Sequence, residues 1–337
     1  MNNKIDVIIP AYNVKDENLY RCLASVACQS IVKDIQVTIV DDGSEKENYV
    51  KVIEAFKEQL DVQIIKNPVN GGCGVARQYG IDHTSNSYFT FLDTDDTFNG
   101  AFALEALRIG IESDNLNYSI CVGCFDEIQI SQEYGAMIIP HNENMVWMHG
   151  KLYRRSYIEN NNIRFHKTSR ANEDGGFNTI IKLMEDKDNP IKFIPARVYY
   201  WHENNNSITR AGNRSYAYGS SKRDSFFGYV ENQIYAIKEV YQKQPNNQQL
   251  LPYAVTVMIN LYGYYLEVCD RAPENAEANF KWCKWYYDEI YKHLQIPEAL
   301  LKRTYFEIMR GKYLSPSFVD IIPEITFKDF IKKLQKN

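Results

Sequence analysis

The chain has 337 residues, which is enough for one large domain or two of ordinary size. Hydrophobic residues make up 45% of it and charged residues 24%, a globular composition that excludes a disordered or fibrous protein. Because 38 Lys and Arg stand against 43 Asp and Glu, the net charge is −5, and no strong positive field is available to attract a nucleic acid.

The first residues show no pattern of a secretory leader. Met1 to Asp6 lack the succession of basic, apolar and small residues that marks a signal peptide, so the sequence predicts a cytoplasmic protein. The longest apolar stretch, residues 250–266, is interrupted by Asn260 and Gly263 and falls short of the roughly 20 residues that a membrane-spanning helix needs. We therefore expect no transmembrane segment.

The seven cysteines are scattered and odd in number, which favours reduced thiols over a disulfide framework. Cys121 and Cys124 have a spacing that is found in metal and redox sites. No second pair accompanies them and they lie in a predicted strand, so we expect two strand thiols of which at least one is buried.

Residues 4 to about 200 alternate short β-rich runs with longer helical ones, a pattern typical of a parallel or mixed sheet covered by helices. Leu19, Leu23 and Val26 recur at helical spacing after the first β-rich run. Ser44 and Glu47 form a capping-box pattern, which predicts a helix from there through residue 56. The predicted strands are residues 6–9, 36–40, 62–65, 88–92, 118–122 and 191–194.

The character of the sequence changes after about residue 210. The β-rich runs end, helical periodicity takes over, and 16 of the 25 tyrosines fall between residues 199 and 313. We therefore predict a second, entirely helical region whose aromatic residues suit a core or an interface, so that a homo-oligomer is a hypothesis. Its last segment, residues 327–336, is basic and amphipathic, and docking on its own domain is favoured over peripheral contact with an anionic membrane.

Polar residues follow the first two predicted strands. Pro10 and Tyr12 end the first, and Asp41 and Asp42 end the second. Because ligands of an open α/β sheet lie beyond the carboxyl ends of its strands, both loops are expected to line one crevice. There Tyr12 can stack on a nucleobase while Asp41 accepts a hydrogen bond from the base. An ordinary turn with a helix cap at Ser44 is the alternative.

A glycine-rich stretch, residues 70–77, precedes a predicted helix. Glycines let backbone N–H groups approach a ligand, a helix N-terminus favours an anion, and Arg77 offers a fork for phosphate oxygens. The stretch matches neither a Walker loop nor the G-x-G-x-x-G pattern. A loop without a ligand is the alternative.

The sharpest local signal is an acidic run, Asp93-Thr94-Asp95-Asp96, which ends a buried-looking strand. Packed carboxylates repel one another unless a cation or a proton offsets them, and hard oxygen ligands suit Mg²⁺ or Mn²⁺. Because alternate residues of a strand share a face, Asp93 and Asp95 can reach one ion while Asp96 points elsewhere. The alternative is an acidic cap on the following helix.

Two further segments carry reactive side chains. Glu173 and Asp174 lie just ahead of a predicted helix, where a carboxylate can serve as a general base or as an N-cap. His202 adjoins a polar loop, where it can complete a metal shell or pack as an isolated histidine. Spacing alone leaves both alternatives open.

Taken together and in this order, the motifs resemble glycosyltransferase family 2. They read Pro-Ala-Tyr-Asn, Val-Asp-Asp-Gly-Ser, Asn-Gly-Gly-x-Gly-x-Ala-Arg, Leu-Asp-x-Asp-Asp, Glu-Asp and His-x-x-x-x-Ser-Ile-Thr, and they cover about residues 4 to 212. The resemblance implies an α/β fold of the GT-A type, a mixed sheet with helices on both faces, over residues 1–212, followed by a helical domain over residues 213–337. It also implies a nucleotide-diphosphate-sugar donor, a divalent cation and transfer with inversion at the anomeric carbon.

The resemblance further implies a donor site. Pro10, Tyr12 and Asp41 look like the uracil-binding set of the family, and Arg77 resembles a diphosphate contact. The implied donor-binding residues are Pro10, Tyr12, Asp41, Asp42, Gly72, Arg77, Asp93 and Thr94.

Metal and catalytic roles follow from the same resemblance. Asp95 resembles the direct ligand of Mn²⁺ or Mg²⁺, and His202 resembles an additional ligand. Asp93 resembles the aspartate of the family that lies beside the donor ribose and the metal. Asp174 resembles the catalytic base, and residues 207–210 resemble the loop that closes over the donor.

One departure narrows the implied activity. The Gln-x-x-Arg-Trp element of processive polysaccharide synthases is absent, since no Arg-Trp pair occurs in the chain. Together with the expected lack of membrane helices, this favours the addition of one or a few sugars over the extrusion of a polymer. The expected enzyme is a hexosyl- or N-acetylhexosaminyl-transferase that uses a UDP-sugar and a glycan, lipid-linked or teichoic-acid-type acceptor. We expect it in the cytoplasm, with the inner face of the membrane as an alternative.

Two other function classes remain open as alternatives. A decayed sugar-nucleotide-binding or scaffold protein is disfavoured by the retained acidic motifs. A nucleotidyltransferase is disfavoured because its glycine-rich phosphate loop is expected soon after the first strand, where this chain has Pro-Ala-Tyr-Asn.

Overall fold

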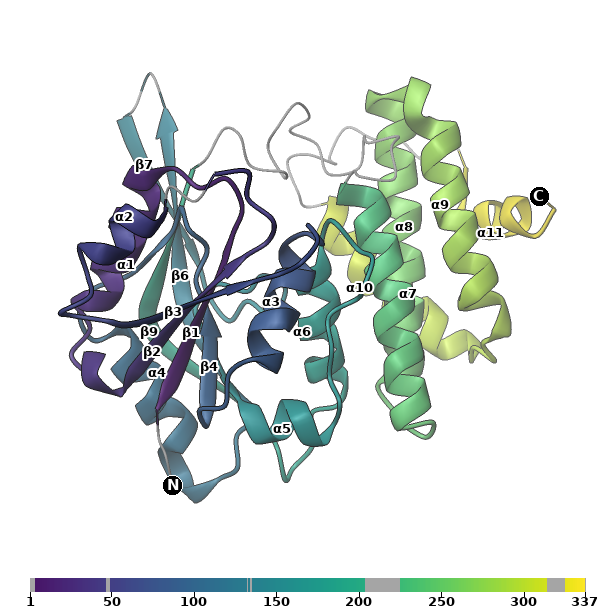
Figure 1. Cartoon of the computed structure of the whole chain (residues 1–337). Helices are drawn as coiled ribbons and strands as arrows, with labels where there is room; N and C mark the ends of the chain where they lie inside the picture. The colour runs from purple at the N-terminus through teal and green to yellow at the C-terminus, as the bar shows by residue number, and fades with distance from the viewer. Residues whose placement is uncertain are drawn as a thin grey trace. The chain divides into compact units, whose positions relative to one another are not determined.

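The chain forms two compact units, residues 1–205 and 206–337 (Figure 1). The computed structural model describes residues 4–46, 49–131, 133, 135–203, 225–313 and 325–336. The described part of the first unit contains a nine-stranded sheet, and that of the second unit is helical, as the sequence predicted.

The strands of the first unit form one mixed sheet in the order β3-β2-β1-β4-β8-β6-β9-β5, with β7 paired to β6. The strands β3, β2, β1 and β4 run parallel to one another, and β8 runs antiparallel to both β4 and β6. All six predicted strands are confirmed, and β5, β7 and β8 are additional. The bounds are β1 Ile5–Ala11, β2 Ile35–Asp41, β3 Asp61–Lys66, β4 Tyr88–Phe91, β5 Thr97–Phe98, β6 Ile120–Ser131, β7 Gly135–His141, β8 Lys151–Arg154 and β9 Ile191–His202.

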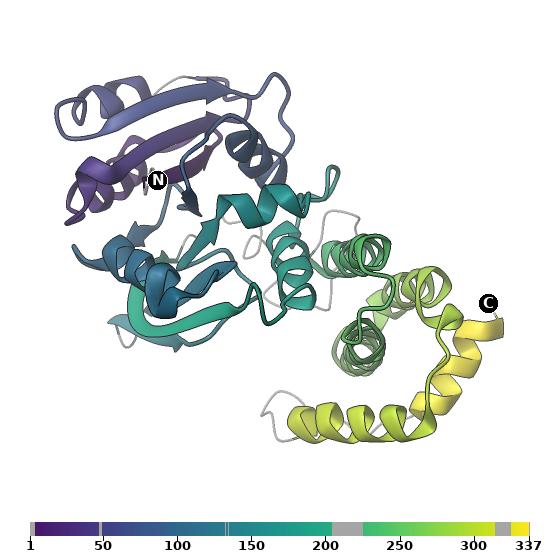
Figure 2. The same cartoon turned by 90° about the horizontal axis from the view of Figure 1, so that it is seen from below.

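Helices cover both faces of the sheet, which confirms the predicted layer order (Figures 1 and 2). One face carries α1 Asp16–Ala27, α2 Tyr49–Glu54 and α4 Ala103–Glu112. The other carries α3 Cys73–Asp82, α5 Arg155–Asn160 and α6 Glu173–Leu183. With the crossovers β1-α1-β2 and β3-α3-β4, the carboxyl ends of the parallel strands gather at one edge of the sheet.

Alternate residues of β1 serve the two faces of the sheet. Val7 and Ile9 are fully buried in the core that α1 and α4 help to form. Ile8 contacts the opposite layer, where a Cβ added to Gly80 of α3 would lie 2.4 Å from the Ile8 Cγ2 atom. The close approach of α3 to β1 therefore requires glycine at residue 80, and it fixes the start of α3 over the edge where β1 ends.

The helix that follows β2 is shorter than predicted. It begins at Tyr49, and the Oγ atom of Ser44 accepts a hydrogen bond from the Asn13 N–H at 3.0 Å. The predicted helix start at Ser44 is wrong, because residues 45 and 46 are not helical. The Ser44 hydroxyl joins the loops after β1 and β2. Glu47, the other half of the expected capping box, lies outside the described residues.

The thiols of Cys121 and Cys124 are both free and buried in β6, as the sequence predicted. Burial raises the pKa of Cys121 to about 12. Both cysteines therefore act as small apolar side chains beneath α4 and β9.

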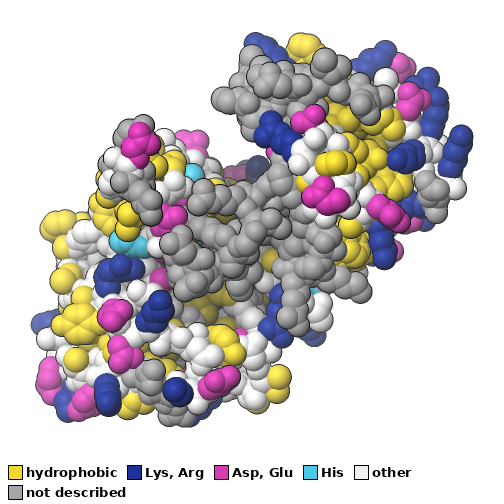
Figure 3. Space-filling model, turned by 90° about the horizontal axis from the view of Figure 1, so that it is seen from above, with side chains coloured by type: hydrophobic (Ala, Val, Ile, Leu, Met, Phe, Trp, Pro, Cys, Tyr) yellow, Lys and Arg dark blue, Asp and Glu magenta, His cyan; other side chains and the backbone are white. Residues whose placement is uncertain are grey.

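The second unit consists of helices in its described part: α7 Ser225–Lys243, α8 Leu250–Arg271, α9 Ala276–Glu289, α10 Glu298–Tyr313 and α11 Phe327–Lys336. Phe330 and Leu334 of α11 are fully buried, and the ring of Phe330 lies 5.2 Å from that of Tyr265 in α8. The predicted docking of the last helix on its own unit is confirmed. None of the helices that the structure describes is long and apolar enough to cross a membrane. On the face shown in Figure 3, acidic and basic side chains are interspersed in each unit.

Candidate active site

The loops that follow β1 and β2 are joined to each other. The two strands pair in parallel up to Ala11 and Asp41, and the Asp42 N–H donates to the Ala11 carbonyl at 2.8 Å. Beyond the strands, Asn13 donates its N–H to Ser44, and its Oδ1 atom accepts the Glu45 N–H at 2.9 Å. These bonds hold both loops as one rigid edge, which brings Pro10, Tyr12 and Asp41 together as expected.

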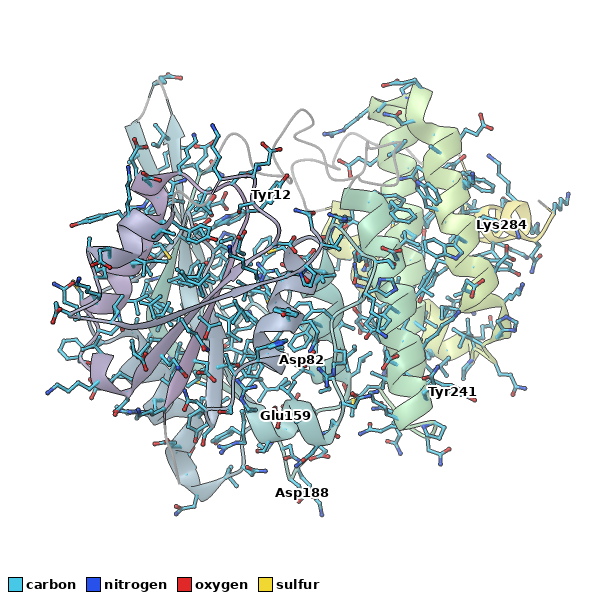
Figure 4. All side chains as sticks on the ribbon, in the orientation of Figure 1. Tyr12, Asp82, Glu159, Asp188, Tyr241 and Lys284 are labelled. Carbon is cyan, nitrogen blue, oxygen red and sulfur yellow. The ribbon has the colours of Figure 1, made fainter. Side chains whose placement is uncertain are left out.

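The edge presents one exposed ring beside one buried carboxylate. Tyr12 is 51% exposed and projects at the upper end of the first unit (Figure 4). Asp41 is 3% exposed and accepts hydrogen bonds from the Ser44 N–H at 2.9 Å and the Tyr49 hydroxyl at 2.8 Å. Burial opposes ionisation, but these hydrogen bonds outweigh it and lower the pKa of Asp41. The carboxylate is thus ionised and fixed, at the same edge of the sheet as the exposed ring of Tyr12.

Asp42 anchors the glycine-rich stretch. Its carboxylate accepts hydrogen bonds from the Asn67 side chain at 2.7 Å and from the N–H groups of Gly71 at 3.0 Å and Gly72 at 2.7 Å. Gly72 has a φ of +88°, and a Cβ added there would lie 3.0 Å from the Cδ atom of Arg170. Asp42 therefore positions the loop, and only glycine fits its turn at residue 72.

Arg77 lies deeper than a phosphate contact at the surface would. Its side chain is 5% exposed, and its guanidinium donates to Glu173 Oε1 at 2.9 Å and to Asp93 Oδ1 at 2.7 Å. The Nε atom of Arg77 is buried without a hydrogen-bond partner. Arg77 thus connects α3 to the end of β4 and to the start of α6, a role that the sequence did not indicate.

The acidic run after β4 divides into two parts. Asp93, Thr94 and Asp95 are partly exposed, whereas Asp96 is 1% exposed. Asp96 accepts hydrogen bonds from the Tyr199 hydroxyl at 2.7 Å and from the His202 N–H at 2.8 Å. Asp96 therefore holds β9 beside the site, but it does not point away from Asp93 as the sequence predicted, since a carboxylate oxygen of each lies within 4.8 Å of the other.

His149 lies beside the acidic run, although no sequence pattern pointed to it. One side-chain atom each of Asp93, Asp96 and His149 lie within 4.8 Å of one another, the one such group of potential metal ligands in the described part of the chain. His149 is 7% exposed, and its Nδ1 atom is buried without a hydrogen-bond partner. Burial lowers the pKa of His149 to about 3, so the ring is neutral and able to act as a ligand or an acceptor.

The predicted metal ligands Asp95 and His202 lie outside this group of three. The Nε2 atom of His202 lies 3.0 Å from the Thr97 hydroxyl, and burial lowers the pKa of His202 to about 4. Residues 207–210, expected to close over the donor, lie outside the described residues. The structure therefore brings Asp93 together with Asp96 and His149 but not with His202.

Asp174 occupies the first turn of α6. The helix begins after Asn172, whose φ is 57°, and the Gly175 N–H donates to the Asp174 carboxylate at 2.7 Å. Burial, followed by the charge of Glu173, raises the pKa of Asp174 to about 7. Glu173, the residue before Asp174, is paired with Arg77, and Arg77 is also paired with Asp93. A carboxylate with a pKa near neutrality is suited to accept a proton during catalysis.

Comparison with known proteins agrees with this arrangement. Residues 6–167 match the model of the family described as Glycosyl transferase family 2. The chain is 25% identical over 223 residues to the uncharacterized glycosyltransferase EpsJ of Bacillus subtilis, an alignment that covers 61% of this chain and 62% of EpsJ. It is 27% identical over 202 residues to the poly(ribitol-phosphate) beta-N-acetylglucosaminyltransferase TarP of Staphylococcus aureus, covering 56% of this chain and 60% of TarP.

Solved structures share the fold. The crystal structure of residues 1–349 of S. aureus TarS in complex with UDP-GlcNAc superimposes with a TM-score of 0.64 at 15% identity, covering 93% of each chain. The complex of the same fragment with UDP gives a TM-score of 0.56 at 17% identity and covers 96% of each chain. At this identity the likeness establishes the GT-A fold.

The sequence relatives are longer than the matched segment. The alignments span 62% of EpsJ and 32% of the glycosyltransferase GlyA of Streptococcus pneumoniae. The motif order, the fold and the family match agree with one another. They identify residues 6–167 as a glycosyltransferase domain that matches glycosyl transferase family 2.

Proposed function

We propose that the chain is an inverting, metal-dependent glycosyltransferase that moves a sugar from a UDP-sugar to the hydroxyl of a cell-surface glycan, lipid-linked or teichoic-acid-type acceptor. The observation that carries the proposal is Asp174. Its carboxylate, with a pKa near 7, lies in the first turn of α6, and the preceding residue, Glu173, is paired with Arg77, which also pairs with Asp93. A base and a leaving-group site are thus held by one network.

The proposed uracil site is the edge formed by β1 and β2. The exposed ring of Tyr12 offers a face for stacking, and the ionised Asp41 offers lone pairs to an N–H of the base. A related fold in S. aureus TarS has been crystallised with UDP-GlcNAc, which supports UDP as the nucleotide. Asp42 and Gly72 shape the neighbouring loop, beside which the ribose and diphosphate would lie.

We propose that Asp93 and Asp95 hold the divalent cation. Both are partly exposed, so a nucleotide diphosphate can approach them, whereas Asp96 and His149 are 1% and 7% exposed. Burial, followed by the charges of Asp95 and Asp93, raises the pKa of Asp96 well above its usual range, which disfavours the ionised form that a ligand requires. Two carboxylates suit Mn²⁺ or Mg²⁺, which when bound would stabilise the charge on the departing diphosphate.

The chain's own residues account for the remaining steps. The acceptor oxygen forms a bond to the anomeric carbon as the bond from that carbon to the diphosphate oxygen breaks, and UDP leaves with the electron pair. The acceptor proton passes to the Asp174 carboxylate. Arg77 keeps Asp93 and Glu173 in place, since its guanidinium contacts both. No covalent sugar–enzyme intermediate is needed.

The pH dependence of turnover tests this proposal. With several UDP-sugars and a panel of acceptors, we expect kcat/KM to rise about tenfold per pH unit below the Asp174 pKa of about 7 and to level off above it. The value of kcat/KM rises with pH because protonated Asp174 cannot accept the acceptor proton. A profile that stays flat from about pH 5 to about pH 9, or a rise that persists in Asp174→Asn, would contradict the assigned base.

A further inference from the structure

A row of aromatic side chains, which the proposed mechanism leaves without a role, comes from β6, β7, β9 and the loop that precedes β8. The ring centroids of Trp147 and Trp201 are 5.6 Å apart at an interplanar angle of 42°. His141 lies 5.1 Å from Trp147, and His149 lies 5.1 Å from Trp201. The row continues inward to Phe125, stacked on His141 at 4.5 Å.

The outer and inner members of the row differ in burial. Phe125 is fully buried and serves the core of the sheet. Trp147 and Trp201 are only partly buried, and Val146, next to Trp147, is 53% exposed. Trp147 and Trp201 also pack against this core, but each keeps part of its surface exposed to solvent. A tilted pair of partly exposed indoles is a surface on which the C–H face of a sugar ring can stack.

The segment that carries Trp147 is fixed to α6 next to the proposed base. Asn178, which lies one helical turn after Asp174, donates its side-chain N–H groups to the carbonyls of Val146 at 3.0 Å and Trp147 at 3.2 Å. A Cβ added to Gly175 would lie 3.8 Å from the Val146 Cγ1 atom. The side chain of Val146, the residue before Trp147, therefore lies close to Gly175, which follows Asp174.

Lys151 of β8 also binds the backbone of the segment that carries Trp147. The ammonium group of Lys151, a residue with no exposed surface, donates to the Trp147 carbonyl at 2.5 Å and to the His149 carbonyl at 3.3 Å. The backbone of Trp147 is therefore fixed from both α6 and β8. Such a rigid placement suits a residue that positions a ligand relative to the base.

We propose that Trp147 and Trp201 form the acceptor subsite, and that the acceptor is a glycan whose terminal residue is a pyranose ring stacked on this pair. The proposal rests on the proposed function and narrows it, because it selects cyclic sugars over acyclic polyol phosphates. Stacking against Trp147 holds the ring beside α6, so that a hydroxyl of the ring reaches Asp174.

Tryptophan fluorescence tests the subsite without any turnover. The chain has four tryptophans, of which Trp282 and Trp285 lie in α9 of the other unit. Methyl β-D-glucopyranoside, methyl β-D-galactopyranoside and chitotriose serve as cyclic probes, and ribitol 5-phosphate serves as the acyclic one. We expect at least one cyclic probe to quench emission saturably, and no quenching by ribitol 5-phosphate.

A double variant locates the signal. In Trp147→Phe/Trp201→Phe the quenching should disappear, because only the two tryptophans of α9 remain. Persistence of the quenching in this variant, an absence of quenching by every cyclic probe in the wild type, or quenching by ribitol 5-phosphate alone would overturn the proposal.

Kinetics separate this subsite from the proposed function. Trp147→Ala should raise the acceptor KM about tenfold, while the affinity for UDP measured by calorimetry stays within a factor of about two, and Trp147→Phe should recover most of the loss. An unchanged acceptor KM, or an equal loss of UDP affinity, would overturn the acceptor role. Failure of the proposed function has another signature, which is that the wild type releases no UDP from any UDP-sugar.

Discussion

Replacing Asp174 with Asn should lower kcat for sugar transfer by about 10²- to 10⁴-fold, the contribution typical of a positioned general base. The amide keeps the shape of the carboxylate but cannot take the acceptor proton. The change removes the charge that burial and Glu173 already disfavour, so the fold should tolerate it. Initial rates of UDP release in the presence of acceptor measure the effect.

Asp188→Asn is the matched control for this change. Asp188 is exposed and lies at the opposite end of the unit from Tyr12 (Figure 4). Asp188→Asn should retain wild-type kcat. Both Asp188→Asn and Asp174→Asn should bind UDP with wild-type affinity. If Asp174→Asn kept more than about a tenth of wild-type kcat, another group would have to accept the proton.

The second large effect is expected from Arg77→Met. The change leaves Glu173 and Asp93 without the guanidinium that pairs with both, and Glu173 is 11% exposed in its side chain. Removing one partner of a buried ion pair strands the other charge, so the free energy of unfolding of the first unit should fall by about 3–5 kcal/mol. UDP-sugar turnover should fall as well, because Asp93 and the start of α6 lose their common support.

Arg108→Met provides the comparison for this loss. Arg108 pairs with Asp34 at 2.7 Å, as Arg77 pairs with Asp93, but the Asp34 side chain is 47% exposed. Ion pairs of this kind contribute about 0–1 kcal/mol. Urea unfolding followed by near-UV circular dichroism should therefore show a much lower midpoint for Arg77→Met than for Arg108→Met. Equal midpoints would show that Arg77 does not connect the site as its contacts indicate.

The sequence predicted the parts of the fold that have a strong local pattern. Six β-rich runs predicted strands, and each of them appears in the sheet. The other three have weaker patterns: β5 has two residues, β7 contains Pro140, and β8 begins with the charged Lys151. These strands are fixed by pairing with β9, β6 and β4 rather than by their own periodicity.

The candidate site was predictable only where the residues of a motif act locally. Asp41 and the acidic run lie at strand ends, and the parallel topology brings them to one edge. Arg77 was interpreted as a phosphate fork, because its partner Glu173 is 96 residues away and no local pattern links them. His149 was missed for the same reason, since it contacts the acidic run only through the pairing of β8 with β4.

The central claim is a metal-dependent uridine-nucleotide site at the carboxyl edge of the sheet. Calorimetric titration of UDP and UDP-GlcNAc, with Mn²⁺ and then with a chelator, tests this claim most directly. The titrated proteins are the wild type, Asp95→Asn and the control Asp16→Asn, which changes an exposed aspartate of α1. We predict binding to the wild type and to Asp16→Asn with Mn²⁺, and at least about tenfold weaker binding with chelator or in Asp95→Asn. Absence of binding by either nucleotide, with or without Mn²⁺, would contradict the account.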